Sequence, residues 1–156
     1  MKFFNHIKRV IHCIMNNPLL NNHFTVEWGG SKIAFTEISG LTIEREVVEY
    51  RSGSSPEDGF TKIPGLQKSS NIVLKRGISK GDNEFYDWIK SVNSDSIERR
   101  DIVINLLDRN HNPVMTWKIR SAWPVKLQGP ELNANGNEVA IETLELAHEG
   151  ITIESD

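Results

Sequence analysis

The chain has 156 residues, a length typical of one domain and sufficient for a hydrophobic core without disulfides or bound metal. Hydrophobic residues make up 38% and charged residues 25% of the chain, which excludes a disordered polymer. The net charge of −3 provides no overall basic field for nucleic acid, and no apolar run approaches the ~20 residues of a membrane-spanning helix. The single cysteine, Cys13, excludes a disulfide framework within the chain.

The first fourteen residues are basic and contain no acidic side chain. Three interpretations are open: a poor signal peptide, a basic amphipathic anchor, or an upstream extension before a natural start at Met15. The apolar stretch is short, is interrupted by His12 and lacks a small-residue cleavage site, which argues against the signal peptide. We therefore expect a doubtful extension over residues 1–14 and a single domain over residues 15–156.

The first predicted strands lie at residues 24–28 and 33–35, where apolar and polar side chains alternate. Because Gly29-Gly30 lies between these two runs, they are expected to form a β-hairpin. A longer alternating run, residues 42–51, has charged residues on both faces. Such a strand does not fit the middle of a two-layer core. We therefore expect one solvent-exposed face and one face partly buried against another subunit.

Residues 52–66 are interpreted as a single long loop, because Gly, Ser and Pro recur and Pro64-Gly65 is a turn dipeptide. A loop of about fifteen residues exceeds the usual connection in a compact domain, and such loops are generally functional or disordered. Its apolar members, Phe60, Ile63 and Leu66, indicate that the loop docks on another surface.

A strand over residues 69–76 is expected to lead into one helix over residues 82–92. From Phe85 onward, the apolar residues of this helix recur at i, i+3, i+4 and i+7, and acidic residues crowd its start. Three further strands are predicted at residues 99–107, 114–121 and 138–149. The fold class is therefore mainly β: an antiparallel β-barrel or sandwich of about seven strands with one packed helix.

No reactive constellation is visible in the sequence. The turn before the helix lacks the Walker order Gly-Lys-Ser/Thr, and Asp82 would repel a bound anion. The histidines show no zinc spacing, and no serine or cysteine has the neighbours of a nucleophile. Trp28, Trp88 and Trp117 occupy core positions of their elements rather than a base-stacking platform. We expect no catalytic, cofactor-binding or metal-binding residue, no enzymatic activity, no specific nucleic acid partner and no stable membrane anchoring.

Ordered motifs from residue 18 to the C-terminal end resemble the tail-tube proteins of contractile phage tails. The similarity is greater to those of extracellular contractile injection systems such as the antifeeding prophage and Photorhabdus virulence cassettes. The motifs are HFTVEWGG (23–30), FTEISGL (35–41), VEYRSG (48–53), PGLQK (64–68), LKRGISKGDNEFYDW (74–88), IERRD (97–101), WKIRSAWP (117–124) and GNEVAIETLELAHEGI (136–151). Residues 1–14 have no counterpart in this resemblance, which favours Met15 as the start.

The resemblance implies a tail-tube barrel shared with the haemolysin-coregulated protein of type VI secretion. Six copies would form a ring, and stacked rings would form a hollow tube that sheath contraction drives through a target membrane. The implied partners are further copies, the sheath, baseplate and terminator tube proteins, and effector cargo in the lumen. Assembly would occur in the bacterial cytoplasm, followed by release or membrane anchoring of the particle.

Within this picture the sequence offers two candidate surfaces. The predicted contacts between subunits are Phe60, Ile63, Leu66, Glu44, Glu46 and Arg51. The predicted sheath-facing residues on the helix are Glu84, Asp87 and Lys90. Two alternatives remain: a tube of a phage virion or type VI system, and a small β-barrel binding module or enzyme that acts alone.

Overall fold

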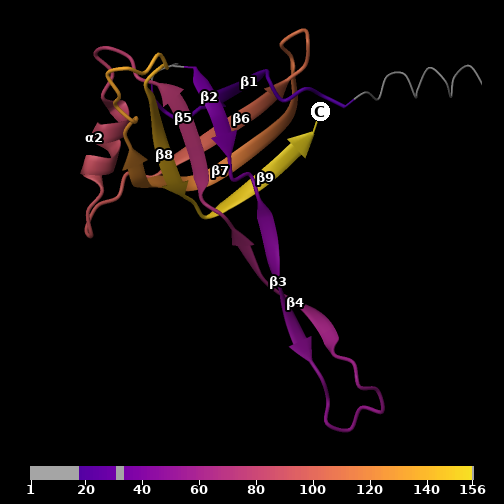
Figure 1. Ribbon diagram of the computed structural model, residues 1–156. Helices are drawn as coiled ribbons and strands as arrows, with labels where there is room; N and C mark the ends of the chain where they lie inside the picture. The colour runs from indigo at the N-terminus through magenta and orange to yellow at the C-terminus, as the bar shows by residue number, and fades with distance from the viewer. Residues whose placement is uncertain (1–17, 31–33, 156) are drawn as a thin grey trace, which may run out of the picture.

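Strands dominate the computed structural model, which describes residues 18–30 and 34–155 of the chain (Figure 1). In chain order the elements are β1 Phe24–Glu27, β2 Phe35–Ser39, β3 Ile43–Tyr50, β4 Thr61–Ser69, β5 Ile72–Gly77, α2 Glu84–Ser91, β6 Arg100–Leu107, β7 Pro113–Gln128, β8 Ile141–Ala147 and β9 Gly150–Ser155. The predicted fold class, mainly antiparallel β with one helix, is confirmed. The doubtful extension at residues 1–14 lies outside the described residues.

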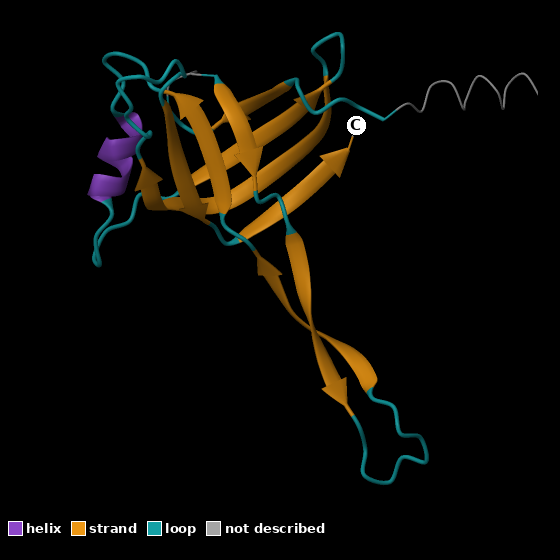
Figure 2. Cartoon of the chain, viewed as in Figure 1, coloured by secondary structure: helices purple, strands orange, loops and turns teal. Residues whose placement is uncertain are grey.

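Strand β7 organises the body of the molecule because it belongs to both halves of a seven-stranded sheet (Figure 2). Its first half pairs with β6 and β9, and β1 lies beyond β6; its second half pairs with β8, followed by β5 and β2. The partner changes next to Ser121, which has a positive φ of 54°. The Ser121 backbone N–H donates to the Asp101 carboxylate at 2.9 Å, which holds this bend in place.

The hydrophobic core lies between the two halves of the sheet and the helix. In β5 and β8 every second residue points inward, as the period of a strand requires, and α2 adds side chains spaced by one helical turn. The indole N–H of Trp88 donates to the Glu98 carbonyl at 2.9 Å, so this buried ring has its polar atom paired. The buried apolar residues are Trp28, Phe35, Ile72, Leu74, Phe85, Trp88, Ile102, Ile104, Ile119, Ala122, Leu144, Leu146 and Ile151.

One charged side chain, Arg76 of β5, is buried within this core at 1% exposure. Its guanidinium carbon lies 3.7 Å from the ring centroid of Phe85 and 5.6 Å from that of Trp28. Its Nε donates to Glu142 at 2.7 Å, and its Nη1 and Nη2 donate to the two carboxylate oxygens of Asp82 at 3.3 and 3.1 Å. Both carboxylates are themselves largely shielded from water. We call this arrangement the Arg76 clamp.

The Arg76 clamp joins three parts of the fold: β5, β8 and the start of α2. Glu142 stands opposite Arg76 on β8, and Asp82 precedes the helix, where its Oδ1 also accepts the N–H of Glu84 at 3.1 Å. A buried charge is tolerated only when its hydrogen-bonding capacity is satisfied, and here two carboxylates and an aromatic face meet that condition. The clamp therefore fixes the start of α2 against β5 and β8.

The predicted loop over residues 52–66 is partly wrong. Strand β4 begins at Thr61, so Ile63 and Leu66 lie on a strand and only residues 51–60 connect β3 to β4. The pairing shifts between Arg45–Gln67 and Val47–Pro64, which leaves an extra residue on β4. Pro64-Gly65 therefore sits at a β-bulge in a two-stranded ribbon, where proline and glycine are compatible with a strand.

Two further sequence-based expectations are corrected. Strand β1 pairs with β6 and β2 pairs with β5, so the hairpin predicted around Gly29-Gly30 is wrong. Alternation identifies a strand but does not select its partner, which here is distant in the sequence. The strand predicted over residues 138–149 is shorter, because β8 spans only Ile141–Ala147. Strand β9 was not predicted, and it pairs with the other half of the bent β7.

Replacing Arg76 with methionine should lower the free energy of unfolding by about 3–5 kcal/mol, because Asp82 and Glu142 lose their shared cation in a shielded site. Urea denaturation measures this loss. The matched control is Lys75→Met on the same strand, which removes a solvent-exposed pair to Glu37 and should cost less than about 1 kcal/mol. Equal losses in the two variants would contradict the role assigned to the clamp.

Candidate assembly surface

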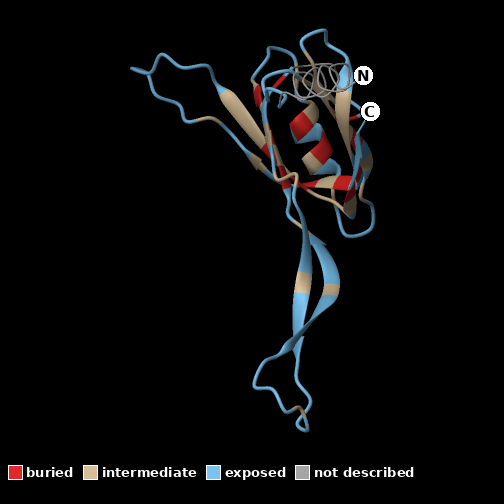
Figure 3. Cartoon of the chain, turned by 90° about the vertical axis from the view of Figure 1, so that its right-hand side faces the viewer, coloured by how far each residue is buried: buried red, intermediate tan, exposed pale blue. Residues whose placement is uncertain are grey.

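Residues 43–69 form an arm that projects away from the body (Figure 1). Strands β3 and β4 pair only with each other, from Ile43 opposite Ser69 to Tyr50 opposite Thr61. Figure 3 shows the arm from a second side, where it is again separate from the body and mostly exposed. An isolated two-stranded ribbon is at best marginally stable in water, so this geometry leaves the arm in need of a partner.

Apolar side chains cover both faces of the arm. Neighbouring residues in a strand point to opposite faces, so the exposed Val47 and Val48 place apolar surface on each side of β3. The exposed large apolar residues of the arm are Ile43, Val47, Val48, Tyr50, Phe60, Ile63 and Leu66. Large apolar residues gathered in this number on one exposed element are typical of an interaction site. The arm therefore has the composition of half of an interface.

Charged residues of the arm are engaged mainly with the arm itself. Glu46 and Lys68 form an ion pair, and the hydrogen bond with Glu46 together with its negative charge raises the pKa of Lys68. Arg45 donates to the Gly65 carbonyl at 3.1 Å across the bulge, and Arg51 donates to the Glu57 carbonyl at 3.2 Å. These exposed contacts hold the two strands in register but add little stability.

All six residues predicted for the contact between subunits lie on this arm. Phe60, Ile63 and Leu66 are 60%, 43% and 76% exposed, so the body of their own chain leaves much of each side chain uncovered. Glu46 is paired with Lys68, and Arg51 approaches Asp58 at 3.9 Å. Glu44, the sixth residue, lies on β3 opposite Lys68. The structure thus brings the six residues together on one projecting element, and their contact with another subunit stays a prediction.

The three residues predicted to face the sheath lie on α2, which Figure 1 shows on the body and apart from the arm. Asp87 and Lys90 are exposed and Glu84 is half-buried, while Phe85 and Trp88 face the core. Tyr86 is also exposed on this helix, and the Lys90 Nζ lies 5.8 Å from the centroid of its ring. The helix therefore offers a second, separate surface with both acidic and basic groups.

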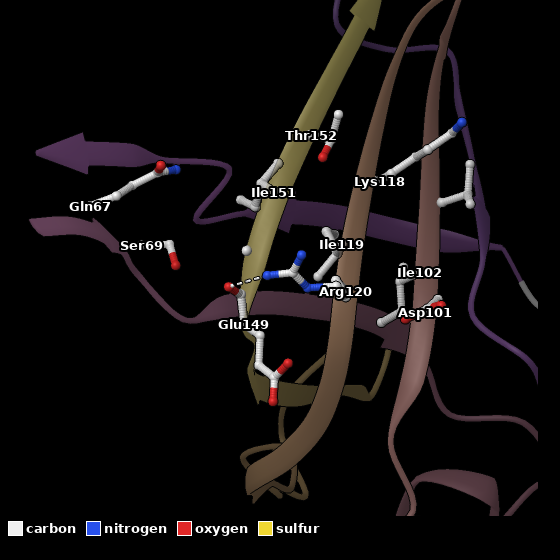
Figure 4. Close-up of a pocket in the computed structure, with 12 residues that line it drawn as sticks. Gln67, Ser69, Asp101, Ile102, Lys118, Ile119, Arg120, Glu149, Ile151 and Thr152 are labelled. Atoms are coloured by element: carbon white, nitrogen blue, oxygen red, sulfur yellow. Dashed lines mark hydrogen bonds between the residues drawn. The ribbon is translucent and has the colours of Figure 1, made fainter.

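A groove of about 530 Å³ lies between the base of the arm and strands β6, β7 and β9 (Figure 4). Gln67 and Ser69 of β4 line its arm side, and Ile102, Ile119 and Ile151 contribute apolar surface from the body. Figure 4 shows Arg120 reaching toward the turn before β9, where its Nη2 donates to the Glu149 carbonyl at 3.2 Å.

The charged residues around this groove have structural partners. Lys118 pairs with Glu154 at 3.0 Å and Glu149 pairs with Arg99 at 2.7 Å. Within the described residues, these ion pairs give Lys118 and Glu149 structural partners at the rim of the groove. In the same part of the chain, no group of three or more His, Cys, Asp or Glu side chains is placed to hold a metal ion. Of the helices described, none has the length and apolar character needed to cross a membrane.

Sequence reasoning missed two features of these surfaces. It did not select Val47, Val48 and Tyr50 for the interface, although three large apolar residues in a strand with charges on both faces were a usable signal. It also missed Arg76, which follows Ile72 and Leu74 at two-residue spacing and therefore points inward with them. A basic residue in phase with core positions was the available sign of the clamp.

Comparison with known proteins connects this architecture to contractile tails. Residues 20–152 match the family model described as T4-like virus tail tube protein gp19. A chain of the PVC sheath-tube complex, an extracellular contractile injection system in the extended state, is 31% identical with a TM-score of 0.84, covering 94% of this chain and 97% of that one. The search of curated proteins gave no match.

Two other solved structures extend the comparison. A chain from the PVC sheath/tube terminator is 32% identical with a TM-score of 0.82, and covers 90% of this chain and 99% of its own. Hcp1 from Flavobacterium johnsoniae is 16% identical with a TM-score of 0.53, covers 85% of this chain and 95% of its own, and so shares the fold alone. The bent β sheet, single packed helix and arm thus define a tube protein of contractile tails. The chain belongs to the T4-like virus tail tube protein gp19 family, as the sequence resemblance predicted.

Because Phe60 and Leu66 are exposed in the single subunit, replacing either with aspartate should change its free energy of unfolding by no more than about 0.5 kcal/mol. Urea denaturation measures the change, at a protein concentration too low for the subunits to assemble. Ile102→Asp, at a fully buried position, is the control and should prevent stable folding. A large loss from Leu66→Asp would mean that the arm packs on its own body.

Proposed function

We propose that this chain is a structural subunit of the inner tube of a contractile injection system and works by stacking with copies of itself. The observation that carries the proposal is the match along nearly the whole length to a chain of the PVC sheath-tube complex. Six copies form a ring, rings stack into a hollow tube, and sheath contraction drives the tube through a target membrane. The role is mechanical, and the protein performs no enzymatic reaction.

In this proposal the arm is the main contact between subunits. Phe60, Ile63 and Leu66 pack against a neighbouring copy, and Glu44, Glu46 and Arg51 make polar contacts at the edge of the interface. Burial of apolar area contributes roughly 25 cal/mol per Å², so a surface exposed on both faces of the arm offers a large gain on association. The same contact covers a ribbon that would otherwise be only marginally stable.

The outer face of α2 is the proposed sheath-facing surface. Asp87 and Lys90 are exposed there, and Glu84 lies at its edge. Exposed charges contribute more to specificity and association rate than to affinity, which suits a surface that must hold a sheath and then release it. Baseplate and terminator proteins are the proposed partners at the tube ends, and effector cargo is the proposed content of the lumen.

The same relatives support a proposal for the particle setting. Two of the matching structures come from an extracellular contractile injection system, in its sheath-tube and terminator complexes. We propose that the subunits assemble in the bacterial cytoplasm and leave the cell, or become anchored to a membrane, only as part of the finished particle. A tube of a phage virion would differ in the surrounding particle rather than in the subunit fold.

Substituting Phe60 or Ile63 with aspartate should abolish tubes in negative-stain electron microscopy, because a charge would enter the apolar contact between copies. The monomer should remain folded by circular dichroism. Tyr86→Asp, at an aromatic position on α2 whose exposure lies between those of Phe60 and Ile63, is the matched control and should leave the tubes unchanged. Normal tubes from both arm variants would refute the arm as the contact between subunits.

If α2 faces the sheath, changes on its exposed side should affect sheath binding and leave tube assembly intact. Reversing the charges of Asp87 and Lys90 together, Asp87→Lys with Lys90→Asp, should preserve tubes but weaken sheath binding at least several-fold in co-sedimentation. The Phe60→Asp variant cannot be used in this sheath-binding experiment, because it should form no tubes. Parent-like sheath binding by the double variant would show that another face of the tube meets the sheath.

A further inference from the structure

The base of the arm is attached to the body by hydrogen bonds from residues outside the arm. Asn71, which follows β4, donates from its Nδ2 to the Glu145 carboxylate on β8 at 2.9 Å. The carbonyl of Ser70, in the same link, lies 2.9 Å from Nε2 of His148 in the turn between β8 and β9. A carbonyl only accepts hydrogen bonds, so His148 carries a hydrogen on Nε2 and donates it.

The other chain crossing at the base is fixed by close packing. Gly40 joins β2 to β3 with φ at +86°, a conformation that side chains disfavour. A Cβ atom at Gly40 would lie 2.1 Å from the Asn71 carbonyl oxygen, so the two strands of the base touch backbone to backbone. The Gly40 carbonyl accepts from the Thr42 N–H at 2.8 Å and from the Ser70 hydroxyl at 3.4 Å.

These contacts have a consequence for the direction of the arm. Strand β3 has eight residues, so at about 3.3 Å per residue the paired strands of the arm extend roughly 26 Å from its base. A rotation of about 10° at the base would therefore move the far end by roughly 4–5 Å, about the spacing between paired strands. Because β3 and β4 form their own sheet, the orientation of the arm depends on its base.

We propose that Gly40, Asn71 and His148 form a latch that orients the arm before it meets a neighbouring copy. They are positioning residues for assembly, because they touch the base of the arm and not the apolar side chains that make the contact. The inference rests on the proposed docking role of the arm. Holding a binding element in its bound direction lowers the ordering cost of association, so the latch increases assembly without adding a contact between copies.

His148 allows a sharp test, because glutamine places its amide nitrogen near the position of Nε2 and asparagine places it near Nδ1. His148→Gln should retain the hydrogen bond to Ser70, whereas His148→Asn should lose it. Asn71→Asp provides a second disruption by setting a carboxylate against Glu145, and Asn71→Asp with Glu145→Gln should restore a donor–acceptor pair.

Each variant is studied by two measurements, one on the monomer and one on tube assembly. Spin labels at Ser54→Cys near the end of the arm and Ser94→Cys on the body, in a Cys13→Ser background diluted with unlabelled protein, report the distribution of arm directions in the monomer. Light scattering reports the critical concentration for tube assembly. His148→Asn and Asn71→Asp should broaden the distance distribution and raise the critical concentration about tenfold, equal to about 1.4 kcal/mol. His148→Gln and the Asn71→Asp/Glu145→Gln double variant should remain close to the parent.

A parent-like critical concentration in both disrupting variants would overturn the latch, and so would unchanged distance distributions in both. Thermal melting of the body should stay within a few degrees of the parent, since these contacts lie at an exposed edge. Leu66→Asp separates this proposal from the docking role. If Leu66→Asp blocks assembly while the latch variants assemble normally, only the latch fails; if Leu66→Asp itself assembles normally, the docking role fails.

Discussion

The buried guanidinium of Arg76 holds β5, β8 and the start of the helix together. It binds carboxylates from β8 and from the start of the helix while stacking on Phe85, so β5 cannot shift without breaking all three contacts. The arm leads directly into β5 through Ser70 and Asn71. A long projecting ribbon transmits any looseness at its base to its far end, and the Arg76 clamp gives that base a firm support within the core.

The arm itself follows a different physical rule from the body. The body buries most of its large apolar residues in its own core, whereas Val47, Val48 and Leu66 remain exposed on a ribbon that pairs with no other strand. A subunit of this kind can be folded and soluble in its body while keeping a substantial part of its hydrophobic free energy for association. The association we propose completes a core that the single chain leaves unfinished, and a latch at the base would reduce its entropic cost.

Patterns confined to neighbouring residues were predictable, and patterns set by distant ones were not. The spacing of Phe85 and Trp88 identified the helix, and alternation identified β5 and β6, because each signal lies within one element. Strand β9 was missed, and its place beside the first half of β7 depends on the bend of β7 at Ser121, which no local pattern reveals. For the candidate surface, the apolar residues near Pro64-Gly65 were recognised, but their strand was hidden because a bulge and a turn share the same residue types.

In the assembled particle we expect the apolar arm of one copy to be buried against another copy. A cryo-EM reconstruction of tubes formed by this chain would show whether this contact exists. We predict that the arm lies on a neighbouring subunit, with Phe60, Ile63 and Leu66 removed from solvent and the latch contacts of Asn71 and His148 intact. An arm left free in solvent, or folded back onto the body of its own chain, would contradict the proposed contact.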